Sequence, residues 1–319
     1  MSDIFEDIGD LDELAREATS PDAGCRRVAA LALGDSGLPG SVPLLGALIN
    51  DADGDVRQQA AEALGQFDGP DVAAFLIKAI HDPEPNVRAA AIASISELKD
   101  KSAAPLLIDA ANDPSEVVRE NVLRSLKSLR DRNSFDVAVK ALSDPAPLVR
   151  VQAVGVIAYL KSEDTVVALK AAAHDADPRV RKAAISALSF SRTEGIAETI
   201  GAALTDSAWS VRESAADSIT DSHVAYIGPE PLIAALKDDY WQVALKAART
   251  LGRLKVASAV LPIAALTSHA EPNLRKEAVA ALGEIAHPEA RPFLERASED
   301  IDADVRKNAR WALQRIALR

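Results

Sequence analysis

A 31-residue repeat is the feature of this chain that most limits its fold. A Val-Arg dipeptide, or a close variant of it, recurs ten times, always 31 residues apart except for one spacing of 32. The second residues of these dipeptides form what we call the arginine column: Arg26, Arg57, Arg88, Arg119, Arg150, Arg181, Arg212, Ala244, Arg275 and Arg306. A fixed period of this length indicates stacked copies of one small unit rather than two compact domains.

Each repeat is predicted to form two helices joined by a turn. In residues 42–67, an apolar stretch precedes the turn at residues 50–55, and a second stretch has apolar residues at helical spacing. Three residues after the arginine column the residue is Ala in nine repeats, and seven residues after it the residue is always Leu or Ile. Small residues let helices approach closely and Leu or Ile fills the space between them. The aromatic content of only 4% fits such helices better than a β-sandwich.

The unit Asp-x-x-x-x-Val-Arg-x-x-Ala-Ala-x-Ala-Leu-Gly, as in residues 51–65, resembles HEAT repeats, specifically the short type named after phycobilisome lyases. The resemblance covers residues 11–319, which we expect to form a single solenoid domain of about ten repeats. It implies an all-α fold, a right-handed α-solenoid whose second helices line the concave surface.

The N-terminal residues 1–18 are strongly acidic. They contain seven acids and one Arg, and so supply −6 of the formal net charge of −12. Ile4, Phe5, Ile8, Leu11 and Leu14 give them an apolar face. We expect this segment to cap the first repeat or to dock on another protein.

Composition excludes several classes of protein. The net charge of −12 disfavours a nucleic-acid partner, whose binding domains are basic. A single cysteine excludes a disulfide framework and a cysteine-built zinc site. The sequence has no apolar run long enough for a membrane span and no secretory signal at its acidic start, so we expect no membrane partner and a cytoplasmic location.

Two polar columns are expected to be structural. An Asp stands six residues before the arginine column in most repeats, at the start of the turn between helices. Its side chain can bind free backbone N–H groups there, and the Arg is expected to bond that Asp or its neighbour in the stack. The Asp column comprises Asp51, Asp82, Asp113, Asp144, Asp175, Asp206, Asp238 and Asp300.

Several residues resemble chemical sites but have simpler explanations. The segment Gly34-Asp35-Ser36-Gly37 is similar to a serine-protease nucleophile, yet it aligns with a helix end where Gly serves as a C-cap. His81 and His174 share a column of polar residues suited to capping a first helix. Cys25 stands directly before the arginine column, in the Val column, where most repeats have Val, so we expect a buried small side chain. We therefore predict no catalytic residue, no cofactor and no metal ligand.

Function is expected in the columns that packing does not fix, namely those one, two, five and nine residues after the arginine column. In repeats 5 and 6 they form a patch with apolar members, which we predict to bind a partner: Val151, Gly155, Tyr159, Lys182, Ser186 and Phe190. The alternative is that tight curvature buries Tyr159 and Phe190 against each other.

Repeats 7 to 10 add two further candidate surfaces. A charged flank of the concave face consists of Lys246, Arg249, Arg253 and Trp311. Matching columns suggest lateral ion pairs of Arg249 with Asp217 and of Arg253 with Asp221, which we favour over an anion site. A turn-edge cluster of aromatics consists of Trp209, Tyr240 and Trp241. The two Trp side chains are expected either to pack on each other or to contact a partner.

These observations favour a non-enzymatic scaffold or adaptor, a monomeric solenoid that grips a partner protein in its concave groove. The alternative function is that of a maturation factor or chaperone-like lyase subunit that loads a bilin, another tetrapyrrole or a metalloenzyme. This alternative rests on the resemblance in repeat type alone, because we find no set of residues in this chain that would supply a lyase activity. Recognition of DNA lesions is a third class, and it would require salt-sensitive binding to DNA.

Overall fold

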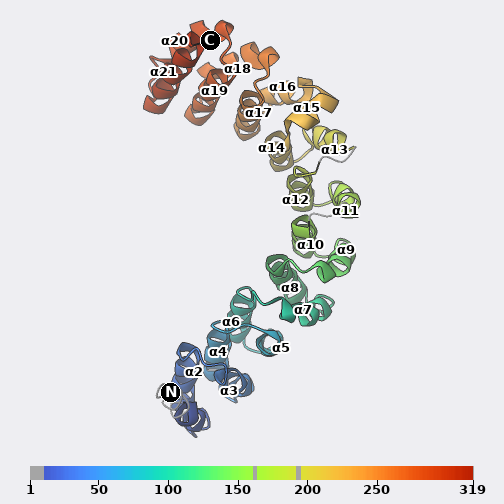
Figure 1. Ribbon diagram of the computed structural model, residues 1–319, viewed down its shortest axis with the longest axis vertical. Coiled ribbons are helices and arrows are strands. Elements are labelled where there is room, and N and C mark those ends of the chain that lie inside the picture. The colour runs from blue at the N-terminus through green and yellow to red at the C-terminus, as the bar shows by residue number, and fades with distance from the viewer. Residues whose placement is uncertain (1–10, 161–163, 192–194, 319) are drawn as a thin grey trace. The chain divides into compact units, whose positions relative to one another are not determined.

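The protein is an all-α solenoid, as predicted. The computed structural model describes residues 11–160, 164–191 and 195–318, and within these ranges every regular element is a helix. The chain divides into two compact units, residues 1–161 and 162–319. In each unit the first helices of the repeats form one layer and the second helices form the other (Figure 1).

The first unit alternates between the two layers along the chain. Its second helices are α2 (Ala23–Asp35), α4 (Gly54–Leu64), α6 (Pro85–Ile95), α8 (Glu116–Leu129) and α10 (Pro147–Leu160). Its first helices are residues 11–17, α3 (Ser41–Leu48), α5 (Pro70–Ala79), α7 (Ala104–Ala110) after the 3₁₀ turn η1 (Lys101–Ala103), and α9 (Phe135–Ala141) after η2 (Arg132–Ser134). Residues 11–17 stand 31 residues before residues 42–48 of α3, so they are the first helix of repeat 1, and the capping or docking role of residues 1–18 stays a prediction. Residues 1–10 lie outside the described residues.

The second unit has the same alternation with one addition. Its second helices are α12 (Pro178–Leu188), α14 (Trp209–Ser218), α17 (Trp241–Arg253), α19 (Pro272–Ile285) and α21 (Ala303–Ala317). Its first helices are α11 (Asp164–Ala172), α13 (Ile196–Ala203), α16 (Glu230–Ala234) with η3 (Ala235–Lys237), α18 (Val260–Ala265) between η4 (Ala257–Ala259) and η5 (Leu266–Ser268), and α20 (Arg291–Ala297) after η6 (Pro288–Ala290). The addition is α15 (Asp221–Ile227), which packs against α13.

The core is built from the two columns of small and branched residues that stand three and seven residues after the arginine column. Ala60 and Leu64 of α4 are fully buried, as are their equivalents in most repeats. Eight residues after the arginine column, glycine brings neighbouring second helices into backbone contact. A Cβ on Gly252 would lie 2.7 Å from Cα of Ala281, and one on Gly34 would lie 2.9 Å from Cβ of Ala63. The predicted helix end in this segment is confirmed, because α2 ends at Asp35 and Gly37 follows with φ of 63°, but Gly34 itself lies inside α2 and packs closely.

The arginine and Asp columns form a ladder that joins successive repeats. Arg57 donates from Nε and Nη2 to the carboxylate of Asp82 in the next repeat, at 2.6 and 3.0 Å. Its Nη1 donates to the carbonyl oxygens of Asp51 and Ala52 in its own turn. The same pairing occurs in Arg26–Asp51, Arg119–Asp144, Arg181–Asp206, Arg212–Asp238 and Arg275–Asp300. The predicted structural role of both columns is confirmed, and in these six pairs the partner of the Arg is the Asp of the following repeat.

We call each position where an Arg would meet the Asp of the following repeat a rung of this ladder. Two rungs depart from the pattern. Ala244 replaces the Arg of repeat 8, and His269 replaces the Asp that would receive it. His269 keeps one function of the Asp, because its Nδ1 accepts the backbone N–H of Glu271 at 3.0 Å. At the third rung, Asp113 of the fourth repeat pairs with Nε2 of His81 at 3.1 Å, while Arg88 donates to its own turn. Both partners of the eighth rung are therefore changed together.

The ladder predicts acid sensitivity. Hydrogen bonds from Arg lower the pKa of Asp51, Asp206, Asp238 and Asp300 below the ordinary 3.8, and burial opposes this in part. Because the unfolded chain binds these protons more tightly, stability should be flat from about pH 7 to 5 and fall as the pH drops below about 4. Urea unfolding followed by circular dichroism across this range measures the effect. Equal stability at about pH 7 and about pH 3 would contradict it.

Repeat 8 is irregular because α15 is inserted before its first helix. The backbone leaves α14 in an extended conformation at Ile219, and the side chain of Thr220 then caps α15. Buried His223 completes this cap, since its Nδ1 accepts the backbone N–H of Thr220 at 3.2 Å. Gly228, with φ of 74°, ends the helix. The sequence showed only one extra residue here and did not predict a helix.

Candidate functional site

The candidate site is the exposed face of the second-helix layer in each unit. We call it the second-helix face, and define it by the residues one, two, five and nine positions after the arginine column. Most residues in these columns lie outside the core, whose buried side chains stand three and seven positions after the same Arg; Asn121 and Ser214, two positions after it, are buried exceptions.

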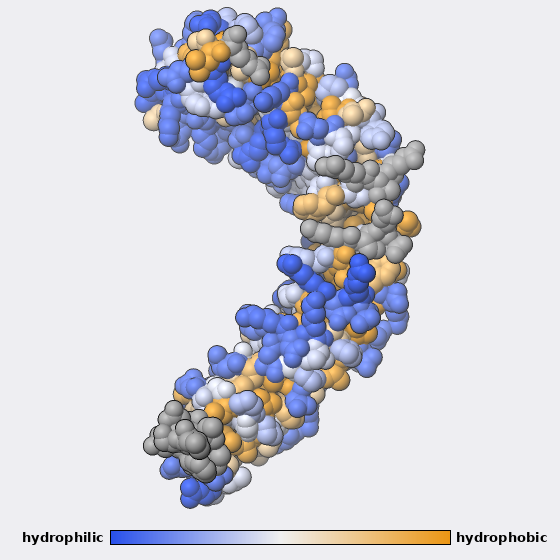
Figure 2. Space-filling view, viewed as in Figure 1, coloured by the Kyte–Doolittle hydropathy of each residue, from blue (hydrophilic) through white to orange (hydrophobic). Residues whose placement is uncertain are grey.

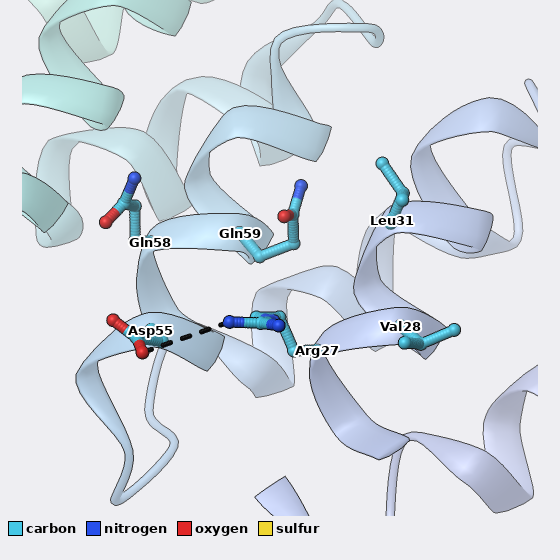
Figure 3. A pocket seen from close by; sticks show the side chains of 6 residues that line it. All are labelled: Arg27, Val28, Leu31, Asp55, Gln58 and Gln59. Atoms are coloured by element: carbon cyan, nitrogen blue, oxygen red, sulfur yellow. Dashed lines mark ion pairs between the residues drawn. The ribbon is translucent and has the colours of Figure 1, made fainter. Parts of the chain in front are cut away.

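In the first unit, the second-helix face contains a groove between α2 and α4. Arg27, Val28 and Leu31 line one side, and Asp55, Gln58 and Gln59 line the other, around a volume of about 340 Å³ (Figure 3). Val28 and Leu31 are 59% and 50% exposed, although both are aliphatic. A long ion pair of 4.0 Å between Arg27 and Asp55 crosses from one side to the other. The groove offers apolar contacts beside two amides that can donate and accept hydrogen bonds.

The apolar side of this groove was not predicted from the sequence. Leu31 stands five residues after its Arg, in the same column as Gly155 and Ser186 of the predicted patch, and Val28 stands two residues after the same Arg. Two aliphatic residues in columns expected to be solvated were therefore a usable signal.

Three residues of the predicted patch lie on α10 in the first unit. Tyr159 is 44% exposed, and the guanidinium carbon of Arg130 stands 4.7 Å from the centre of its ring. The stem of Lys127 crosses Gly155, where a Cβ would lie 2.8 Å from Cδ of that lysine. Val151 begins the same stripe on α10. The part of the patch on α10 is thus an aromatic ring bordered by two cations from α8 and its C-cap.

The other three residues of the patch belong to the second unit. Lys182 lies 3.5 Å from Glu213, and the hydroxyl of Ser186 is 2.8 Å from that of Ser214. Phe190 follows the end of α12 and is 78% exposed. The alternative in which Tyr159 and Phe190 bury each other stays a prediction, because the two rings belong to different units. Partner binding by the patch stays a prediction.

The turn-edge aromatics form a stack with a different pairing from the one expected. Trp209 stacks on Tyr240 with ring centres 5.5 Å apart and planes 12° from parallel. The guanidinium carbon of Arg212 stands 5.7 Å from the centre of the Tyr240 ring. The expectation that Trp209 packs on Trp241 is therefore wrong. Tyr240 is brought within reach because it is the N-cap residue of α17, directly before Trp241.

The charged flank of the second-helix face is already engaged in lateral contacts. Lys246 pairs with Asp217 at 3.2 Å, and Arg249 pairs with Glu277 of the next repeat at 2.8 Å, which raises the pKa of Arg249. Arg253 donates to the carbonyl oxygen of Ile219 at 2.8 Å.

The two ion pairs predicted for this flank, Arg249 with Asp217 and Arg253 with Asp221, do not form, because each arginine bonds a different partner. Arg249 bonds Glu277 and not Asp217, which instead receives Lys246. Asp221 does not reach Arg253, because it stands in the first turn of α15 and not at the end of α14. The inserted helix thus changes which side chains meet.

Comparison with protein families decides the identity of the repeat. A model of HEAT repeats matches residues 11–84, 73–140, 135–220 and 229–314. The chain belongs to the HEAT-repeat family. The comparison with curated proteins finds no match for the sequence.

Solved structures resemble this HEAT-repeat chain in fold. An engineered protein is 20% identical with a TM-score of 0.52, and the match covers 97% of this chain and 99% of that one. YibA of E. coli is 18% identical with a TM-score of 0.63, covering 84% and 98%. Kap95p, from a structure that concerns its binding to RanGDP, is 15% identical with a TM-score of 0.64, covering 97% of this chain and 50% of Kap95p. The chain therefore spans half the length of Kap95p.

The remaining candidates take structural positions in the HEAT repeats. The hydroxyl of Ser36 donates to the carbonyl of Leu33 and is 2.8 Å from the hydroxyl of Ser41. Asn50 and His81 stand in the same column, seven residues before the Arg. Asn50 caps its first helix as predicted, because it donates to the carbonyl of Gly46, whereas His81 pairs with Asp113 instead.

Cys25 is exposed, so its predicted burial is wrong. The Val column is buried between successive repeats, and Cys25 belongs to the first repeat of the described chain. Among the described residues, no three His, Cys, Asp or Glu side chains gather as a metal site, and no helix is both long and apolar enough to span a membrane.

Proposed function

We propose that this HEAT-repeat chain is a non-enzymatic scaffold or adaptor, and that a segment of a partner protein binds along the second-helix face. The observation that carries this proposal is the set of large apolar side chains exposed in columns that packing leaves free. They are Val28, Leu31, Tyr159, Phe190 and Trp311. A protein that needed only to stay folded could place polar residues in all of these columns, and exposed apolar surface often marks interaction sites.

The fold supports a protein partner in general terms. Solenoids of stacked repeats present extended surfaces to other chains, and Kap95p is a structural relative whose structure concerns binding to RanGDP. The exposed side chains of the second-helix face define the chemistry of the partner. It brings apolar side chains to the groove of the first unit and to the ring of Tyr159.

Removing the exposed rings tests the proposal. The full chain carrying Tyr159→Ser and Phe190→Ser should retain about a tenth or less of the partner that the unchanged chain retains, because buried aromatic anchors dominate such interfaces. Its helical circular dichroism should stay unchanged.

A matched control is available on the first-helix layer. Val167 and Leu261 are exposed aliphatic residues of α11 and α18, at 76% and 54%. The variant with Val167→Ser and Leu261→Ser should retain the partner at the level of the unchanged chain. Equal retention by both double variants would exclude a binding role for Tyr159 and Phe190.

The short repeat type named after phycobilisome lyases is our proposal for the repeat subclass, on the basis of the 31-residue period. The alternative function attached to it is loading of a tetrapyrrole as a maturation factor. Mixing the purified chain with a bilin or haem distinguishes the two, since a shifted absorbance band that survives gel filtration would favour the alternative.

A further inference from the structure

The last second helix carries an aromatic residue between two cations. Lys307, Trp311 and Arg315 are four residues apart on α21, so they follow one another along one side of the helix. The guanidinium carbon of Arg315 lies 5.2 Å from the centre of the Trp311 ring. The ring is held against α19, because a Cβ on Gly283 would lie 2.4 Å from it. Trp311 nevertheless remains 37% exposed.

The surrounding surface is positive on a chain that is negative overall. On α17, α19 and α21 the second-helix face carries six cations and two acids, against a formal net charge of −12 for the whole chain. The cations are Lys246, Arg249, Arg253, Lys276, Lys307 and Arg315, and the acids are Glu277 and Glu284. Hydrophilic side chains gather over these three helices in Figure 2.

Part of this positive charge has no acidic partner. Lys246, Arg249 and Arg315 pair with carboxylates, at 3.2, 2.8 and 3.8 Å. Arg253 bonds a backbone carbonyl. Within the described part of the chain, Lys276 and Lys307 form no ion pair with a carboxylate. Both stand one residue after the arginine column, on neighbouring helices, so their charges are about 10 Å apart at the usual helix spacing.

We propose that the second-helix face of α19 and α21 binds an acidic segment of a partner protein that carries an aromatic or branched aliphatic anchor. The anchor packs on the exposed ring of Trp311, and carboxylates on either side of it pair with Lys276 and Lys307. This inference rests on the proposed function and names the chemistry of the segment bound at this end of the face. Charge complementarity selects the acidic occupant.

The pattern of charges favours a peptide over a nucleic acid. Glu277 and Glu284 lie on the same face as the cations and would repel a continuous run of phosphates. A peptide can place its acids opposite Lys276 and Lys307 and neutral residues opposite the two glutamates. The single exposed indole also suits one anchor side chain better than a series of stacked bases.

A labelled peptide tests the proposal in the full chain. The probe is a fluorescein-labelled 12-residue peptide with Asp and Glu on both sides of one Phe and no basic residue, and binding is measured by fluorescence anisotropy. Lys276→Glu with Lys307→Glu should weaken binding at least about tenfold, and Trp311→Ala by about fivefold to tenfold. Raising the salt concentration to about 0.5 M should also weaken it, because exposed charges are then screened.

Matched controls separate this site from general charge. Lys99→Glu with Lys101→Glu makes the same change in net charge at two exposed positions of the first unit and should leave binding unchanged. Peptides with the acids made neutral, or with Phe replaced by Ala, should bind at least about tenfold more weakly.

Three outcomes would overturn the inference. They are equal binding by the two lysine double variants, equal binding of the neutral peptide, and tighter binding of an oligo(dT) strand than of the acidic peptide. Lys276→Gln with Lys307→Gln provides a milder variant if the charge reversal unfolds α21. Failure of this test leaves the proposed function standing as long as Tyr159→Ser with Phe190→Ser still releases the partner.

Discussion

Replacing Gly252 by valine is expected to lower the free energy of unfolding of the second unit by about 3 kcal/mol, at the upper end of what overpacking costs. A Cβ at this position would lie 2.7 Å from Cα and 2.8 Å from Cβ of Ala281. The obstructing atoms include the backbone of α19, which cannot rotate away as a long side chain could. Helices α17 and α19 would have to separate, and the contacts between repeats 8 and 9 would weaken along their length.

Hydrogen exchange in the full chain measures this effect where it arises. Amides of α17 and α19 should exchange faster in the Gly252→Val variant, and urea unfolding should shift to lower concentration. The matched control is Ala202→Val, at an exposed position near the end of α13. The two variants introduce the same side chain, so comparable loss of stability in both would show that close approach at Gly252 has no special role.

Removal of one ladder carboxylate is the second large effect. Asp206→Ala should lower the free energy of unfolding by about 2 kcal/mol. Removing one partner of a fully buried ion pair costs about 3–5 kcal/mol, and the expected loss is smaller here because solvent reaches part of this pair. Arg181 donates to both carboxylate oxygens of Asp206 at 2.7 Å, and both side chains are less than 15% exposed. The variant would leave the Nε and Nη2 of Arg181 without their acceptor between two repeats.

The irregular third rung supplies the control for this prediction. Asp113 accepts the backbone N–H of Ser115, just as Asp206 accepts that of Ala208, but its ion pair is with His81 and not with Arg88. Asp113→Ala therefore removes the turn hydrogen bond without removing an arginine pair. Urea unfolding of both variants at neutral pH gives the comparison. An equal loss of stability would mean that the turn, and not the arginine, accounts for the effect of Asp206→Ala.

The regular parts of the fold could be predicted from the sequence because each column repeats one local environment. Ala60 and Leu64 are buried for the same reason as their equivalents in other repeats, so the period reveals the core directly. The insertion of α15 breaks this logic. One extra residue near Ala244 gave no measure of how far α14 would be shortened, and the capping box of α15 has His223 at the position where the usual sequence signal is Glu or Gln.

Side-chain pairing on the second-helix face was harder to predict than helix position. A long cation such as Arg249 can reach an acid in either the preceding or the following repeat, and column alignment alone does not choose between them. The structure selects Glu277. Likewise Trp209 had two aromatic candidates, and the N-cap position of Tyr240 brought that ring closer than the ring of Trp241.

Site-directed photocrosslinking tests most directly the claim that partners bind on the second-helix face. A photoreactive phenylalanine analogue would replace Leu31, Tyr159 or Trp311 on that face, and Val167 or Leu261 on the first-helix layer, each in the full chain in its source cell. The account predicts crosslinked partner protein from at least one position on the second-helix face and none from Val167 or Leu261. Partner crosslinked only from the first-helix layer would contradict it.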